Sequence, residues 1–357
     1  MNIGLIFGGK SAEHEISLMS ARSVYENIDK SAHRVYLIGI SKEGKAFYFE
    51  GDIDKLQDGG WLSEVSDAEV VFYSNQRSPG LYSGEETIVL FDVFFPVMHG
   101  PFGEDGKVQG LLELSGLPYV GCGVLASAVS MDKEISKRLF AVEELCQVNY
   151  EPMLYFEDME EKIRNVEAKI GYPCFVKPAN MGSTIGISKA RNEEELRQAI
   201  KTAFLYDEKL LIEEALDARE IEVSVLGNME KAEVSVLGEI IPSFEFYDYE
   251  AKYRSGTSKL LIPADVAAEV SDEVKRMALT AYRAVGAEGL SRVDFFIDKK
   301  NGKVYINEIN SMPGFTPISM YPKLWEKSGI SYPRLIERLL ELAFLRSERK
   351  VRPNQMK

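Results

Sequence analysis

Short apolar runs alternate with a helical pattern over the first hundred residues, and this order constrains the fold more than any other feature. Apolar runs at 3–7, 35–40 and 89–97 predict buried strands. Between the first two, Ile16 and Val24 fall on one face of a predicted helix. Strands that alternate with helices predict an α/β unit with a parallel sheet and helices on both faces. Residues 44–88, rich in Gly, Ser, Asp and Glu, predict a surface excursion from this unit.

The size and composition of the chain predict a globular protein of two or three domains. It has 357 residues, which exceeds a single typical core, and 45% are apolar. The net charge is −14, with no basic cluster of the kind that binds nucleic acid. No apolar run reaches the length of a membrane helix, and the first residues lack the basic leader of a signal peptide. We therefore expect neither a nucleic acid nor a membrane as partner.

The chain contains three cysteines, Cys122, Cys146 and Cys174, without paired spacing. This odd number argues against a disulfide framework or a zinc site and fits a reducing compartment. We expect a cytoplasmic protein.

The rest of the chain predicts two further units, with boundaries that give domains at 1–121, 122–216 and 217–357. A basic tail after Arg346 is expected to fray. The expected elements are a short helix and turn at 110–119, a helix at 131–145, a strand at 174–177, a helix at 193–204, strands at 210–214, 220–226 and 232–241, a polar loop at 247–260, a helix at 271–285, a hairpin at 290–310 and a C-terminal helix at 331–345.

The predicted hairpin carries two acids and an amide on one face. Its first strand alternates, so that Arg292 and Asp294 point to one side. Asn301-Gly302 is a strong turn signal, and Glu308 and Asn310 share a face of the return strand. A loop with an odd number of residues would place Asp294 opposite Glu308, whereas an even loop would not. Opposed like charges destabilise a sheet unless a cation compensates them, and three oxygen ligands suit Mg²⁺. Acids that simply face water remain the alternative.

Three further segments could handle a phosphate group. Lys177 ends a predicted strand, and a lysine there can reach a nucleotide phosphate. The turn at 182–186 is glycine-rich and could cover phosphate oxygens with backbone N–H groups, although it is not a Walker A loop. Lys133 begins a predicted helix, where anions are favoured. The alternatives are an ordinary hairpin turn and surface lysines.

Taken together, these segments resemble the ATP-grasp ligases, and within them the D-alanine–D-alanine ligases. The resemblance covers nearly the whole chain in order. The motifs that carry it are Gly8-Gly9-Lys10-Ser11-Ala12-Glu13-His14-Glu15-Ile16-Ser17, His99-Gly100, Gly103-Glu104-Asp105-Gly106, Met131-Asp132-Lys133, Val176-Lys177-Pro178, Gly182-Ser183, Ile212-Glu213-Glu214, the run 247–253, Ser291-Arg292-Val293-Asp294 and the run 307–316.

The resemblance implies an ATP-grasp fold of three domains, with the nucleotide bound between the central and C-terminal domains. It implies ligation of two D-alanines through a D-alanyl phosphate for peptidoglycan precursor synthesis, with ATP as co-substrate, two Mg²⁺ ions (or Mn²⁺) and a homodimer. The implied roles are as follows: Lys133, Lys177 and Lys252 at ATP phosphates; Glu213, Leu216 and Glu220 around adenosine; Asp294, Glu308 and Asn310 at the metal; Glu13 and His99 at the first D-alanine; Arg292 and Gly314 at the oxyanion; Ser319 at the second D-alanine; and Ser183 and Tyr253 in a hydrogen-bond triad with Glu13.

Two departures from the family pattern concern the adenine and acceptor sites. Glu214 stands where a lysine is common, and Pro317-Ile318 precede Ser319 where Ser-His is common. Within the family, Tyr253 favours an amine acceptor and a dipeptide product over the D-alanine–D-lactate and D-alanine–D-serine alternatives. A dinucleotide-binding oxidoreductase is disfavoured because Gly8-Gly9 is not part of a G-x-G-x-x-G motif. A binding module without catalysis would leave the lysines and acids without a shared purpose.

Overall fold

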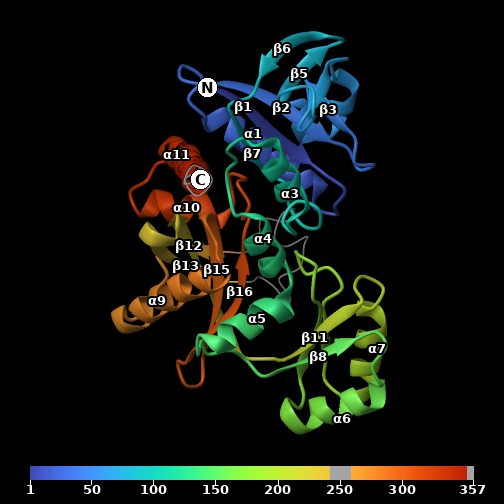
Figure 1. Cartoon of the computed structure of the whole chain (residues 1–357). Coiled ribbons are helices and arrows are strands. Elements are labelled where there is room, and N and C mark those ends of the chain that lie inside the picture. Colours follow the sequence, from blue (N-terminus) through green and yellow to red (C-terminus); the bar gives the residue numbers. More distant parts are fainter. Residues whose placement is uncertain (242–258, 352–357) are drawn as a thin grey trace.

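The computed structural model describes residues 1–241 and 259–351, which form three main sheets and a small fourth one. In Figure 1 the N-terminal unit lies at the top, the unit with β8 and β11 at the lower right, and the unit with β12 to β16 at the lower left. None of the helices within these described ranges is long and apolar enough to cross a membrane.

The N-terminal sheet is parallel at its centre, as predicted. Its order is β3-β2-β1-β7, and β1 (Asn2–Gly8) runs parallel to both β2 (Arg34–Ile40) and β7 (Val93–Pro96). Helix α1 (His14–Asn27) packs against it through a buried face. The prediction of one strand over 89–97 is wrong. Its first residues belong to β6 (Glu86–Leu90) of another sheet. The chain turns at Asp92, whose carboxylate accepts a bond from the Asn2 backbone N–H at 2.7 Å.

The predicted surface excursion over 44–88 is more structured than expected. It contains β3 (Ala46–Phe49), α2 (Lys55–Asp58), a 3₁₀ turn at Gly60–Glu64, β4 (Glu69–Val71), β5 (Gly80–Ser83) and β6. Trp61 inserts its ring into the N-terminal core, and a Cβ on Gly39 would lie 2.2 Å from that ring. The excursion therefore completes one side of this core.

The central sheet is antiparallel, with the order β10-β9-β11-β8. Its apolar residues form a core shared only with the two helices of the same unit. The elements are β8 (Tyr150–Leu154), α6 (Met159–Lys169), β9 (Cys174–Pro178), β10 (Ser188–Ala190), α7 (Glu193–Ala203) and β11 (Lys209–Glu214).

The C-terminal sheet is antiparallel and has five strands in the order β14-β13-β12-β15-β16. Its core includes residues of the segment before the central sheet, namely Cys122, Ala126 and Phe140. The elements are β12 (Ala218–Gly227), a 3₁₀ turn at Met229–Lys231, β13 (Glu233–Ile241), β14 (Lys259–Leu261), α9 (Ala268–Ala284), β15 (Gly289–Asp298) and β16 (Val304–Asn310). Because β14 begins at Lys259, the last residues of the predicted loop 247–260 are strand.

The helix predicted at 131–145 is α5 (Lys133–Val142), and a helix that was not predicted, α4 (Val124–Met131), comes directly before it. Asp132 separates them in an extended conformation, and its carboxylate accepts bonds from the backbone N–H groups of Glu134 and Ile135. This N-cap satisfies donors that have no partner inside the helix. The cap fixes where α5 begins and therefore where Lys133 lies. Earlier in the chain, the short helix predicted at 110–119 is α3 (Lys107–Ser115).

The N-terminal unit and the end of the chain share one hydrophobic core. Strand residues such as Phe95 pack with residues from α10 (Met320–Lys327) and α11 (Tyr332–Val351). The rings of Phe95 and Phe315 meet edge to face at 6.1 Å. This core and the one that contains Cys122 cross the predicted boundaries at 121 and 216, and those boundaries stay a prediction.

The expectation of a frayed tail after Arg346 is wrong for the part of it that the structure describes. Helix α11 continues to Val351, and Arg346 is buried. Its guanidinium donates to the carbonyls of Tyr119 and Gly121 and lies 4.2 Å from the centroid of the Tyr119 ring. Arg349 and Lys350 pair with Glu288 and Glu113. The basic residues hold the helix against the junction between units.

Candidate active site

The hairpin of β15 and β16 places Asp294 opposite Glu308 and Arg292 opposite Asn310, as one of the two predicted registers requires. The reason differs from the expected one. The backbone N–H of Asp298 donates to the Lys303 carbonyl, which leaves four residues in the loop, an even number. A β-bulge after Asp294 then shifts the register, so that Asn307 is the extra residue. Without the bulge, Asp294 would face Asn307.

The carboxylate of Asp294 is held from two sides. Arg292 donates to both of its oxygens at 2.7 Å, and the side-chain nitrogen of Asn310 donates to Oδ2 at 3.0 Å. The guanidinium also lies 3.0 Å from Oε2 of Glu222, which faces Asp294 on the neighbouring strand β12. Sequence reasoning assigned no role to Glu222. Arg292 therefore balances two acids at the position where a metal was predicted.

The donor set fits a hard divalent cation. Asp294 and Glu308 supply carboxylate oxygens, and Asn310 supplies an amide oxygen, which are the ligand types that Mg²⁺ prefers. Within residues 1–241 and 259–351, no group of three or more His, Cys, Asp and Glu side chains is arranged to hold a metal. A cation here would use two carboxylates and one amide, with the rest of its shell from water or phosphate.

Lys133 links the hairpin to the glycine-rich turn. It is the first residue of α5, and its Nζ donates to the Met181 carbonyl at 2.6 Å. The same ammonium lies 3.7 Å from Oε2 of Glu308. Figure 1 shows α5 beside both β16 and the central unit that carries β11. The predicted metal hairpin and two of the segments predicted to handle phosphate, the glycine-rich turn and Lys133, therefore meet at the start of this helix.

A buried carboxylate joins the central sheet to α5. Oε2 of Glu213 lies 2.5 Å from Nζ of Lys177, and Oε1 lies 2.8 Å from Nζ of Lys137. Burial opposes ionisation of Glu213, but the two ammonium groups outweigh it and lower its pKa to about 2. For Lys177 burial again opposes the charge, and Glu213 raises its pKa above the ordinary value. Glu213 and Lys177 are therefore both charged at neutral pH.

The glycine-rich turn reaches the N-terminal unit through Ser183. Its hydroxyl donates to Oε1 of Glu13 in a short hydrogen bond, and a Cβ on Gly182 would lie 2.8 Å from the other oxygen. Ser183 and Thr184 have φ values of 51° and 62°, in the left-handed region that residues other than glycine rarely adopt. Such strain persists where surrounding contacts impose it, and it is concentrated at functional sites.

His99 is buried and neutral. Its Nδ1 lies 3.2 Å from the Met312 carbonyl, and its Nε2 lies 2.9 Å from the Ser20 hydroxyl. The first contact requires a proton on Nδ1, so that Nε2 accepts from Ser20. Desolvation lowers the pKa of His99 to about 4. Glu104 Oε1 lies 3.9 Å from Nδ1 of His99. Burial and, next, the charge of Glu13 raise the pKa of Glu104 to about 8.

Gly314 and Ser319 face each other before α10. A Cβ on Gly314 would lie 2.7 Å from the Ser319 hydroxyl, so any larger residue would require this hydroxyl to move. That hydroxyl accepts from the Thr316 backbone N–H at 3.0 Å and lies 2.7 Å from the Thr316 hydroxyl. Ser319 is also the N-cap of α10, where the helix favours negative charge. The serine is well placed for a carboxylate, even though Pro317 precedes it.

The remaining predicted residues lie near the same region or outside the residues that the structure describes. Leu216 lies in the connection after β11, and Glu220 lies on β12 opposite Phe296. Glu214, the departure noted in the sequence, points away from Glu213 and accepts from Asn149 at 3.0 Å. Lys252 and Tyr253 lie outside the described residues.

Three residues at the site were not predicted: Lys137, Glu222 and Glu104. Glu104 belongs to a quoted motif, and its spacing from His99 was visible in the sequence. Glu222 follows the period of two on β12 from Glu220, which would have been a usable signal. Lys137 gave no signal, because a lysine on an amphipathic helix ordinarily reaches solvent.

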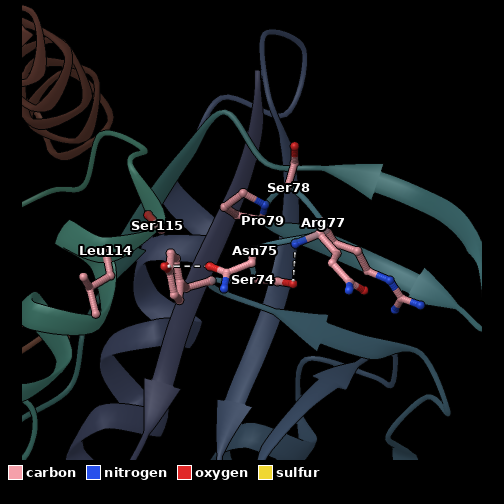
Figure 2. Close-up of a pocket in the computed structure, with 9 residues that line it drawn as sticks. Ser74, Asn75, Arg77, Ser78, Pro79, Leu114 and Ser115 are labelled. Carbon is pink, nitrogen blue, oxygen red and sulfur yellow. Dashed lines mark hydrogen bonds between the residues drawn. The ribbon is translucent and has the colours of Figure 1, made fainter.

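A surface cavity of about 360 Å³ lies elsewhere, between the loop 73–79 and α3. Figure 2 shows that the side chain of Arg77 points away from Leu114 and Ser115. Arg77 instead pairs with Glu69 at 2.7 Å. None of the predicted site residues lines this cavity.

Two antiparallel sheets joined at α5, with Lys133 beside an acidic hairpin, define an ATP-grasp protein. Comparison with known proteins narrows the class. The family model described as "D-ala D-ala ligase N-terminus" matches residues 2–122, and "D-ala D-ala ligase C-terminus" matches residues 139–341. The chain belongs to the D-alanine–D-alanine ligase family.

Full-length relatives and solved structures agree with this assignment. D-alanine–D-alanine ligase of Thermoanaerobacter sp. (strain X514) is 50% identical over 347 residues, covering 96% of each chain. That of Heliobacterium modesticaldum is 50% identical over 356 residues, covering 98% of this chain and 96% of the relative. The D-alanine–D-alanine ligase structure from Coxiella burnetii has a TM-score of 0.88 at 31% identity, covering 99% and 97%. The VanG D-Ala:D-Ser ligase from Enterococcus faecalis has a TM-score of 0.86 at 35% identity, covering 96% and 99%.

Proposed function

We propose that this protein uses ATP and Mg²⁺ to join two D-alanines into D-alanyl-D-alanine, a precursor for peptidoglycan. The observation that carries the proposal is the meeting of three segments at Lys133, which contacts the glycine-rich turn and approaches Glu308. The full-length match to the family supports the choice of substrate.

The first step transfers the γ-phosphoryl group of ATP to the carboxylate of the first D-alanine. A carboxylate is a poor electrophile, and its acyl phosphate carries a good leaving group. Positioning and charge stabilisation dominate phosphoryl transfer. Lys133 and Lys177 bind phosphate oxygens, and Glu13 receives the ammonium of the substrate beside His99. Leu216, Glu213 and Glu220 lie on the adenosine side.

Mg²⁺ held by Asp294, Glu308 and Asn310 would neutralise phosphate charge and align the transferred group; two ions, or Mn²⁺, fit the same donor types. The protein's own side chains prepare this position. Arg292 and Asn310 already fix the orientation of Asp294 through three hydrogen bonds.

In the second step the amine of the second D-alanine attacks the acyl phosphate, and inorganic phosphate leaves. Ser319 binds the carboxylate of this acceptor at the start of α10. Arg292 and the Gly314 N–H stabilise the oxyanion, which requires donors that are already in place. The hydrogen bond from Ser183 keeps Glu13 oriented during both steps.

A product assay tests the proposal. The protein is incubated with ATP, Mg²⁺ and D-alanine alone or with D-lactate or D-serine, and the products are identified by mass. D-alanyl-D-alanine with one phosphate released per dipeptide is the expected result. A D-alanyl-D-serine product is the second candidate, because one solved relative is named a D-Ala:D-Ser ligase. Absence of both phosphate release and dipeptide would refute the proposal.

Variants of the hairpin test the assigned metal site. Asp294→Asn and Glu308→Gln keep the shape of each side chain and remove its charge, so phosphate release is expected to vanish while the circular dichroism spectrum stays unchanged. Asp298→Asn, at the half-buried end of β15, is the matched control and is expected to keep full activity. Full activity in either site variant would remove the hairpin from the mechanism.

The compartment and assembly belong to the same proposal. The cysteines Cys122, Cys146 and Cys174 are all free, which is compatible with a reducing cytoplasm.

We expect a homodimer from the resemblance to the family. Light scattering on the purified protein would give twice the chain mass, and a single chain mass at micromolar concentration would contradict the expectation.

A further inference from the structure

Lys137 is a buried cation that the proposed reaction does not use. It lies on α5 one turn after Lys133, and only 2% of its side chain is exposed. Lysine is almost never buried to this degree without a partner. The Lys137 ammonium lies 2.8 Å from Glu213 and 5.4 Å from the centroid of the Tyr150 ring.

The two lysines around Glu213 differ in their access to the site. Lys137 and Lys177 bind opposite oxygens of the carboxylate. The side chain of Lys177 is 14% exposed, whereas those of Lys137 and Glu213 are 2% and 3% exposed. Lys177 therefore lies on the open side of the carboxylate, and Lys137 lies behind it. Two ammonium groups against one carboxylate leave this cluster with one excess positive charge.

An ion pair that holds Lys177 competes with any phosphate that needs the same ammonium. If Glu213 had Lys177 as its one cation, moving Lys177 to a phosphate would leave a buried charge uncompensated, which is strongly destabilising. With Lys137 in place, Glu213 keeps a partner when Lys177 moves. A ligand binds less tightly when the competent arrangement of its site is rarely populated.

We propose that Lys137 is a positioning residue that holds Glu213 and so leaves Lys177 available to a nucleotide phosphate. This inference rests on the proposed function, in which Lys177 binds ATP. It adds a role for Glu213, whose carboxylate holds Lys137 and Lys177 close to each other where β11 meets α5.

Calorimetric titration of the full chain with ATP and Mg²⁺, without D-alanine, tests the proposal. Lys137→Met is expected to weaken ATP binding about tenfold or more, since each tenfold step corresponds to 1.4 kcal/mol. Adding Glu213→Gln to this variant removes the charge that traps Lys177. The double variant is therefore expected to bind ATP as tightly as Glu213→Gln alone, so that Lys137→Met costs nothing once residue 213 is uncharged.

Lys162→Met is the matched control. It removes one of two lysines from Glu151, another buried acid in the central unit, where Lys169 remains at 2.7 Å. ATP binding is expected to stay unchanged. Thermal unfolding monitors the fold of each variant. If Lys137→Met does not fold, the comparison of the double variant with Glu213→Gln carries the test, because neither contains an unpaired acid.

Two outcomes would overturn the inference. These are wild-type affinity in Lys137→Met, or an equal loss when Lys137→Met is added to Glu213→Gln. The second would show that Lys137 affects ATP binding without acting through Glu213. A wild-type protein that binds no ATP and forms no dipeptide would refute the proposed function itself, which the product assay detects separately.

Discussion

At the scale of single residues, Gly314 illustrates how a missing side chain can define a site. A methyl group there would meet the Ser319 hydroxyl at 2.7 Å and push it from its two bonds to Thr316. Misplacing a reacting or binding group by about 1 Å can lower a rate about 100-fold. The space beside Gly314 therefore belongs to the proposed acceptor site as much as Ser319 does.

We predict that Gly314→Ala lowers kcat/KM for the acceptor D-alanine about 100-fold by displacing Ser319. The matched control is Gly110→Ala in α3, where an added Cβ meets nothing within 4 Å. Alanine in a helix should stabilise the control by about 0.5–1 kcal/mol and leave its rate unchanged. Steady-state kinetics with both variants checks the prediction, and equal rates would contradict it.

The buried imidazole of His99 gives a prediction about pH. Its pKa falls from the ordinary 6.5 to about 4, so the unfolded chain takes up a proton between these pH values while the folded protein does not. Stability from this group is complete above pH 6.5 and is lost as the pH falls towards 4. Between pH 8 and pH 5 the loss is about 2 kcal/mol.

Urea unfolding of the wild type and His99→Gln at both pH values measures this loss. The stability difference between the two proteins should change by about 2 kcal/mol in favour of the variant at the lower pH. A difference that does not depend on pH would show that His99 takes up its proton in the folded state.

Residue-level prediction from the sequence succeeded where a local period was sufficient. Alternation along β15 placed Asp294 on the correct face, and Val293, Phe295 and Ile297 entered the core. The period of two could not give the register, which depends on the bulge after Asp294. Lys137 was missed because its partner, Glu213, lies on a strand of the central sheet, and no local pattern reports that contact.

At the scale of elements, α11 shows how a charged segment can become structural. Basic residues at a chain end usually indicate a solvated tail, yet Arg346 finds two backbone carbonyls and an aromatic ring in the interior. Helix α10 was also not predicted, since Pro322 argues against a helix. It lies in the first turn, where proline is tolerated.

We predict that Arg346→Met destabilises the protein by about 2–4 kcal/mol, because two buried carbonyls lose their donors. Arg334→Met on the same helix is the control. Arg334 is more than half exposed and pairs with Glu341, so its loss should change stability by less than about 0.5 kcal/mol. Urea unfolding compares the two, and equal stabilities would show that the buried guanidinium contributes nothing net.

At the scale of the whole molecule, the cores do not follow the order of the chain. The central sheet has a core of its own, whereas the N-terminal sheet shares one core with α10 and α11. The sequence predicted most helices and strands in their order along the chain, because those features are local. It could not predict that apolar residues near both ends of the chain pack together.

We predict that a fragment of residues 148–216 folds alone, since its core contacts are internal. A chain that ends at residue 328 lacks α11 and is expected to leave the N-terminal sheet exposed and aggregation-prone. Circular dichroism and urea unfolding of both fragments check this. Cooperative unfolding of the N-terminal sheet in the truncated chain would contradict it.

The shared core also sets the order of events during synthesis on the ribosome. Domains usually fold as they emerge, the N-terminal ones first. Here the first sheet is made early, but helix α11, which covers it, is translated long afterwards. The apolar surface of the sheet must therefore wait until α11 has been synthesised, a period in which chaperones would have the most to protect.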